Sequence, residues 1–161
     1  MNWKAFAEAA PGLAKTGEKL LDGPGVLLLG TVRQDGGPRI SPVEPVFGDG
    51  ELYLGMMWRS LKALDLLRDP RCTVHNAICD RMAPDGELKL QGRAREVVDL
   101  KVRARYGDLL YEKIGWRPEE PRFHLFTVTV ERVGLFVMGD GARTVTRWRA
   151  GGRVETFEQT P

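Results

Sequence analysis

Hydrophobic and polar residues alternate along much of the chain. The alternation is clearest at 87–97, where the apolar side chains fall on one face and the charged and amide side chains on the other. A period of two predicts a strand with one buried face. Similar patterns predict further strands at 25–33, 39–47, 51–57, 71–78, 122–130, 132–138 and 143–149.

A second period, of three to four residues, predicts three helices. They cover 13–21, 60–69 and 99–116, and Ser60 and Asp99 suit the N-cap positions of the last two. Within the middle helix one side carries three leucines, namely Leu61, Leu64 and Leu67. Gly107 is a weak point in the last helix, because glycine is a poor helix former.

Short Asp-Gly turns at 35–36 and 49–50 link neighbouring strands, which indicates antiparallel pairing. The pattern therefore predicts a mainly β fold, a closed or partly closed antiparallel barrel with flanking helices. We expect one domain over residues 1–161. A helical segment at 1–22 precedes the barrel, and the polar tail at 151–161 could be disordered.

Composition narrows the class of protein. The 161 residues are 42% hydrophobic and 29% charged, and the net charge of +2 is too small to imply nucleic acid or an anionic membrane. No apolar run approaches the roughly 20 residues that span a bilayer, and Glu8 interrupts any signal-peptide pattern. We expect a cytoplasmic protein without a nucleic-acid or membrane partner. Cys72 and Cys79 lie on opposite faces of a strand, so free and buried thiols are expected.

Several candidate sites carry little weight. The two cysteines and two histidines do not have the spacing of a metal site, and His75 and His124 lie on different predicted strands. For each histidine a structural role is favoured over a catalytic one. The sequence does not show which contacts the histidine makes. Three late arginines, Arg143, Arg147 and Arg149, lie near Trp148 and could grip RNA. Solvated charge on an exposed strand face is the favoured interpretation of these arginines.

The junction at 59–62 is more informative, because a strand there leads into a helix through Arg59, Ser60 and Lys62. Unpaired amides at a helix N-terminus favour an anion, and these side chains add a hydroxyl and positive charge. Taken alone, the pattern also fits a capped surface helix with solvated cations. The neighbouring segment 39–47 contains Pro42 and Pro45, which prevent regular pairing on both sides. Its free main-chain groups could bind a flat polar ring whose phosphate rests on the helix.

These segments together resemble the flavin-binding split-barrel group related to pyridoxamine 5'-phosphate oxidase. The resemblance covers roughly residues 10–150 and rests on GTVRQDGGPRISPVEPVF, ELYLGMMWRSLKALDLLRDPRCTV and LQGRAREV, in the family's order and spacing. It implies a six-stranded antiparallel Greek-key split barrel. It also implies a homodimer, with a flavin mononucleotide (FMN) in each of two clefts between the subunits.

The resemblance further implies a set of cofactor-binding residues. Arg39 should reach the phosphate or ribityl region, and Ser60 and Lys62 should hold the phosphate. The remaining positions lie along the ring, border the cofactor or add charge beside the phosphate. They are Ile40, Ser41, Pro42, Val43, Gly55, Met56 and Arg59.

Two departures argue against vitamin B6 oxidase activity. Glu44 occupies the position of a lysine that helps to bind the substrate phosphate, and Glu87 replaces a cofactor-binding glutamine. The expected function is an FMN oxidoreductase that transfers a hydride to an unidentified small organic substrate. The alternatives are a reductase dependent on the deazaflavin coenzyme F420 and a non-catalytic flavin-binding or sensing module. The ring of such a cofactor carries the chemistry, so no catalytic residue is predicted.

Overall fold

The computed structural model describes residues 1–80, 83–139 and 142–159. Within them the helices are α1 (Trp3–Ala9), α2 (Pro11–Asp22), α3 (Leu61–Arg68) and α4 (Leu100–Ile114). The strands are β1 (Leu27–Val32), β2 (Pro38–Val43), β3 (Pro45–Gly48), β4 (Glu51–Met57), β5 (Arg71–Asn76), β6 (Glu87–Glu96), β7 (Phe123–Gly139), β8 (Ala142–Arg149) and β9 (Glu155–Gln159).

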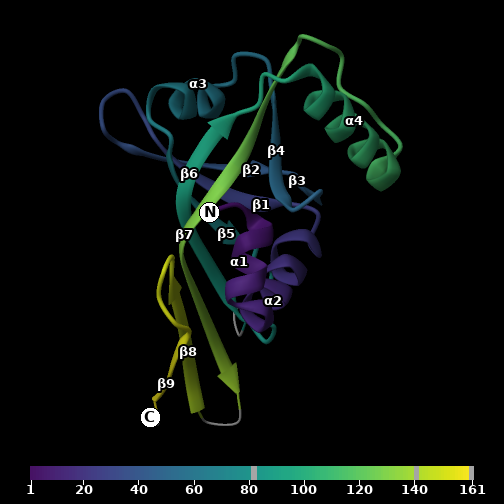
Figure 1. Cartoon of the computed structure of the whole chain (residues 1–161). Helices are drawn as coiled ribbons and strands as arrows, with labels where there is room; N and C mark the ends of the chain where they lie inside the picture. The colour runs from purple at the N-terminus through teal and green to yellow at the C-terminus, as the bar shows by residue number, and fades with distance from the viewer. Residues whose placement is uncertain (81–82, 140–141, 160–161) are drawn as a thin grey trace.

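The strands form one antiparallel sheet, with seven of them in the order β2-β1-β5-β6-β7-β4-β3. Only Glu44 separates β2 from β3, yet these strands stand at opposite ends of this order. The sheet therefore curls into a split barrel (Figure 1). Pro42 and Pro45 lie on these two edge strands. The prediction that the prolines prevent pairing on both sides is thus confirmed.

The strand count exceeds the predicted six. The segment 39–47 is divided at Glu44 into two strands, whereas 122–138 forms one strand, β7, instead of two. The end of β7 extends beyond the barrel with β8 and β9 as an arm (Figure 1). Disorder is thus the wrong interpretation for 155–159, which pairs with β8, and residues 160–161 lie outside the described part.

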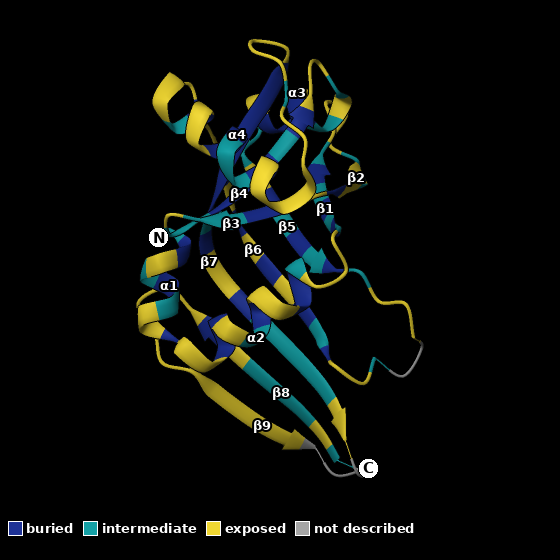
Figure 2. Ribbon diagram, turned by 90° about the vertical axis from the view of Figure 1, so that its right-hand side faces the viewer, coloured by how far each residue is buried: buried dark blue, intermediate teal, exposed yellow. Residues whose placement is uncertain are grey.

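One face of the sheet encloses the larger core cluster, and a second buried cluster packs α4 against β3, β4 and β7. In β6 the predicted alternation is confirmed, because Leu88, Leu90 and Ala94 are buried and the charged face is largely exposed. Helices α1 and α2 cover the barrel beside the start of the arm (Figure 2). Phe6 of α1 packs on Trp148 of β8 in the core.

A register shift bends the sheet where β6 pairs with β7. It falls between Gln91 and Gly92, and a Cβ on Gly92 would lie 1.8 Å from the Thr129 carbonyl oxygen. No other residue fits this close approach of two backbones without a shift of the strand.

Both cysteines are free, as predicted, but only Cys72 is buried, and Cys79 is exposed. Burial raises the pKa of the Cys72 thiol to about 12, so it is inert at neutral pH. Among the described residues no helix is both long and apolar enough to cross a membrane.

Candidate functional site

A cavity of about 530 Å³ is lined by residues of α3 and α4 among others. These two helices lie at the same end of the barrel (Figure 1). We call this cavity the α4 cavity. Its walls come from the end of β2, from β4, from α3 and α4, and from the loop that follows α4. The residues that line it are Pro42, Val43, Glu44, Gly55, Met56, Met57, Lys62, Tyr106, Leu110, Trp116, Arg117, Pro118, Glu119, Arg122 and Phe123.

The α4 cavity brings together half of the predicted cofactor-binding residues, namely Pro42, Val43, Gly55, Met56 and Lys62. Barrel closure explains the meeting of β2, β4 and α3. The other predicted residues lie elsewhere: Arg39 and Ile40 line a second cavity on the outer face of the sheet. The lining of neither cavity includes Ser41, Arg59 or Ser60.

Arg39 is engaged with a carboxylate that the sequence analysis missed. Its Nε donates to Asp65 Oδ2 at 2.7 Å, and the same carboxylate accepts from the Thr31 hydroxyl at 2.9 Å and from Arg68 at 3.2 Å. Burial would raise the pKa of Asp65, but hydrogen bonds from Arg39, Thr31 and Arg68 lower it below its usual range. The Asp65 cluster joins α3 to β1 and β2. The only local signal was the three-residue spacing of Asp65 and Arg68 on one helix.

The N-terminus of α3 leaves polar groups without partners. Ser60 occupies the N-cap position with an extended backbone, as predicted, but its side chain makes no capping hydrogen bond. Its Oγ is buried without a hydrogen-bond partner among the described residues. Lys62 Nζ is 3.4 Å from the Pro42 carbonyl oxygen, and Arg59 is exposed with a φ of 55°. A buried hydroxyl without a partner is costly, which favours a ligand here.

The leucine side of α3 faces outward. Leu61, Leu64 and Leu67 are 62%, 37% and 45% exposed, whereas Ala63 and Leu66 are buried. Ile40 on β2, and Met57 and Trp58 just before α3, are also more than half exposed. Exposed apolar side chains gathered on neighbouring elements are typical of an interaction surface.

Tyr106 is a second residue that the sequence analysis missed. Its hydroxyl lies so close to Gly55 that a Cβ there would be 2.1 Å from it. Burial, with a smaller effect of the Glu44 carboxylate, raises the pKa of Tyr106 to about 12. At neutral pH the α4 cavity therefore contains a protonated phenol that can donate a hydrogen bond. Nothing in the sequence signals the contact, because 51 residues separate Tyr106 from Gly55.

A buried arginine, Arg103, holds in place the loop 115–122 that forms one wall of the α4 cavity. Arg103 of α4 donates to both carboxylate oxygens of Glu120, each at 2.8 Å, and also to the Phe123 and Val97 carbonyl oxygens. Its guanidinium lies 4.1 Å from the centre of the Phe123 ring. These contacts hold the loop 115–122 against β7, so this wall of the cavity is built in advance of any ligand.

The histidines lie outside the lining of the α4 cavity. His124 is buried and stacks on Trp58 with a ring separation of 4.6 Å, and its Nε2 has no hydrogen-bond partner in the described part of the chain. Its Nδ1 is 3.5 Å from the carboxylate of Glu96 at the end of β6. His75 Nδ1 is 2.7 Å from the Asn76 carbonyl oxygen. Among the described residues, no group of histidine, cysteine and acidic side chains could hold a metal ion.

The sequence pattern of the pyridoxamine 5'-phosphate oxidase family matches residues 13–158, which is most of the chain. The chain belongs to this family. No curated protein matches it.

Solved structures support the same fold. ChuZ of Campylobacter jejuni has a TM-score of 0.71 at 14% identity, over 88% of this chain and 61% of ChuZ. A NimC/NimA family protein of Clostridium acetobutylicum scores 0.59 at 17% identity, over 92% and 93%. General Stress Protein 26 of Bacillus anthracis str. Sterne scores 0.59 at 20% identity, over 75% and 91%. At such identities the likeness to these structures supports the split-barrel fold alone.

Proposed function

We propose that this member of the pyridoxamine 5'-phosphate oxidase family binds FMN in the α4 cavity and transfers a hydride to a small organic substrate. The observation that carries the proposal is the convergence of Pro42, Val43, Gly55, Met56 and Lys62 on one cavity. The family resemblance of the sequence assigns these same residues to a flavin.

The residues present fit an FMN. The phosphate would be held by Lys62, by the Ser60 hydroxyl and by the free amides that begin α3. The ring would lie along Pro42 and Val43, on the side of β2 that pairs with no strand. Bound there, the flavin would supply the hydride chemistry. The protein would orient the flavin and exclude water from it. Arg39 would not hold the phosphate itself, because its Nε donates to Asp65; it would instead help to position α3.

The lining beyond β2 suits a flat organic substrate. Trp116 and Phe123 offer aromatic surface, and the Tyr106 hydroxyl holds a proton that it can donate to a substrate oxygen or nitrogen. Glu44 places negative charge at the same cavity, which disfavours a phosphorylated substrate such as a vitamin B6 phosphate.

The proposal includes a homodimer. Exposed Met57 lines the α4 cavity, and the exposed leucines share α3 with its lining residue Lys62, so a second copy packed on them would close the open side of the cavity. Sedimentation of the purified protein at micromolar concentration should give a species of twice 18.0 kDa. A species of 18.0 kDa alone would contradict this part of the proposal.

The deazaflavin F420 and a non-catalytic flavin module remain the second candidates. Both share the phosphate and ring contacts of the α4 cavity. Titration of the apoprotein with FMN and with F420 separates the cofactors, and we expect tighter binding of FMN. Reduction of the bound cofactor by a nicotinamide donor or by reduced deazaflavin, followed by reoxidation with candidate acceptors, separates an enzyme from a binding module.

The sharpest test of the site is Lys62→Ala. A charge-assisted contact with phosphate contributes about 1.5–3 kcal/mol, so the variant should bind FMN roughly tenfold to a hundredfold more weakly. Flavin fluorescence at low salt measures the affinity. Lys15→Ala is the matched control, because Lys15 is an exposed lysine on α2, away from the α4 cavity. Equal FMN affinity in Lys62→Ala and the wild type would refute the phosphate contact.

A further inference from the structure

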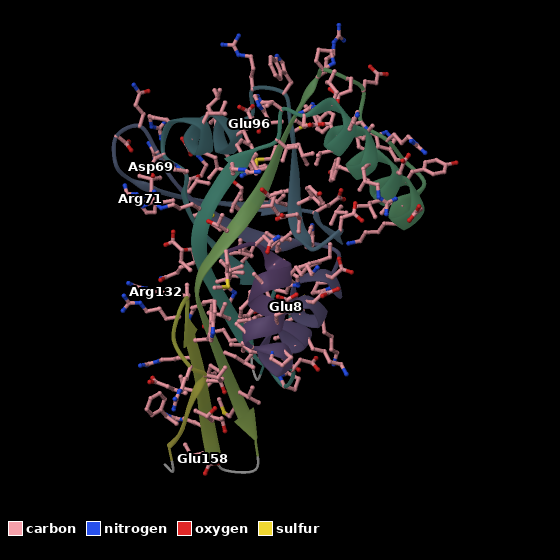
Figure 3. All side chains as sticks on the ribbon, in the orientation of Figure 1. Glu8, Asp69, Arg71, Glu96, Arg132 and Glu158 are labelled. Carbon is pink, nitrogen blue, oxygen red and sulfur yellow. The ribbon has the colours of Figure 1, made fainter. Side chains whose placement is uncertain are left out.

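The outer face of β6, β7 and β8 carries another cavity, strongly basic and of about 640 Å³. We call it the basic groove. Its lining includes one acidic residue, Glu155, and five cations, which are Lys89, Arg132, Arg147, Arg149 and Arg153. Arg132 projects from β7 on the side away from α1 (Figure 3). The groove is therefore separate from the helix-covered side of the barrel, and its lining shares no residue with the α4 cavity.

Strand register sets the order of these side chains. Lys89, Gly134 and Arg147 are direct partners across β6, β7 and β8 and so form one row. Neighbouring strands lie about 4.8 Å apart, which puts the backbones of Lys89 and Arg147 about 10 Å from each other. A Cβ on Gly134 would meet no atom within 4 Å, so the space between the two cations is open.

The next row places two positive charges directly opposite each other. Arg132 pairs with Arg149 across β7 and β8, an arrangement that destabilises a sheet. Within the described residues no carboxylate forms an ion pair with Arg132, Arg147, Arg149 or Arg153. Arg147 has Glu155 as its strand partner, but its guanidinium lies instead over the Phe157 ring, 5.7 Å from the centroid. Lys89 forms an ion pair with Glu87, so Arg132, Arg147, Arg149 and Arg153 are the cations of the groove that have only solvent and Glu155 nearby to balance them.

Aromatic surface adjoins the cations. Phe136, Val145 and Phe157 form the neighbouring row across β7, β8 and β9. Phe157 is 46% exposed, and its ring lies under the Arg147 guanidinium. Phe157 lies just outside the lining of the groove and is joined to it by Arg147, so a ligand with its phosphate over Gly134 could extend a flat ring toward Phe157. If these arginines were only solvated surface charges, the open space at Gly134 and the exposed Phe157 ring beside them would have no role.

We propose that the basic groove binds an organic phosphate that carries a flat ring, of the nucleoside diphosphate class. Lys89 and Arg147 hold the phosphate from two sides of Gly134, and Arg132 and Arg149 neutralise its remaining charge. The ring stacks on Phe157. This site goes beyond the proposed flavin function. A small ligand is favoured over a nucleic-acid strand, because the groove is the size of a pocket for one small molecule.

The test is a calorimetric titration of the full-length protein with ADP at about 50 mM salt, where surface charges are little screened. We expect one ADP per chain, and an affinity reduced about tenfold in Arg147→Gln and in Arg149→Gln. The matched control is Arg33→Gln, because Arg33 is an exposed arginine that does not line the groove. Circular dichroism should show every variant folded, since these arginines are exposed.

Other titrations distinguish this site from the flavin site. Lys62→Ala should bind ADP as the wild type does, even if it loses FMN. The proposal is overturned if ADP does not bind below about 1 mM, a weak-binding limit of about −4 kcal/mol. It is also overturned if Arg33→Gln loses as much affinity as Arg147→Gln, or if FMN displaces ADP. Binding of a single-stranded oligonucleotide that ADP does not compete with would assign the groove to nucleic acid and equally overturn it.

Discussion

The Asp65 cluster makes a prediction that links the stability of the barrel to the candidate site. Asp65→Asn keeps the size of the side chain but removes the charge that Arg39 and Arg68 share. Because Asp65 bonds to both β1 and β2 and also holds Arg68, its loss should loosen the helix that carries Lys62.

The expected cost follows from the exposure of the three charged side chains. Removing one partner of a fully buried ion pair costs about 3–5 kcal/mol. Here the carboxylate is 5% exposed, whereas Arg39 and Arg68 are 26% and 38% exposed and can be partly solvated in the variant. The asparagine oxygen can still accept from Thr31, so we expect a loss of about 2 kcal/mol in the free energy of unfolding.

Urea denaturation followed by circular dichroism measures this loss, with equal protein concentrations because the proposed dimer would make stability concentration-dependent. A loss of that size should lower the melting temperature by about 4–8 °C. Asp85→Asn is the control, since Asp85 is an exposed carboxylate that lies 3.4 Å from the Lys19 amino group. Its effect should stay within about 0.5 kcal/mol.

The pH dependence provides a second check. The pKa of Asp65 is lower in the folded protein than in the unfolded chain, so its stabilisation is complete above the unfolded value of about 3.9. The stabilisation is lost as the pH falls through the folded pKa. The difference between the wild type and Asp65→Asn should therefore be largest near neutral pH and shrink below about pH 4. A difference that is small at neutral pH, or that does not depend on pH, would refute this account of the cluster.

Three glycine substitutions test other parts of the structure. Gly92→Ala should cost about 3 kcal/mol or more, measured by urea denaturation, because the new Cβ meets the Thr129 carbonyl oxygen at 1.8 Å. Gly107→Ala should instead stabilise the protein by about 0.5–1 kcal/mol, because this helical glycine has open space around it. Gly55→Ala should displace the Tyr106 hydroxyl and weaken FMN binding more than about tenfold in a fluorescence titration, with unchanged binding as the contrary result.

Much of the local structure could be predicted from near neighbours along the chain. The two-residue alternation of 87–97 predicts which face of β6 is buried, and Ser60 marks the start of α3. The prolines of 39–47 exclude a central strand, and both β2 and β3 are indeed edges. These features depend on backbone geometry and on which face is apolar, and both leave a periodic trace in the sequence.

The candidate site depended on the closure of the barrel. Tyr106 reaches Gly55 from 51 residues away, and Arg39 meets Asp65 across 26 residues, so no local pattern records either contact. Hydrophobic spacing on α3 likewise gave no indication that its leucine side faces outward. Periodicity shows that a side chain lies on a common face, but only the packing of distant segments decides what that face meets.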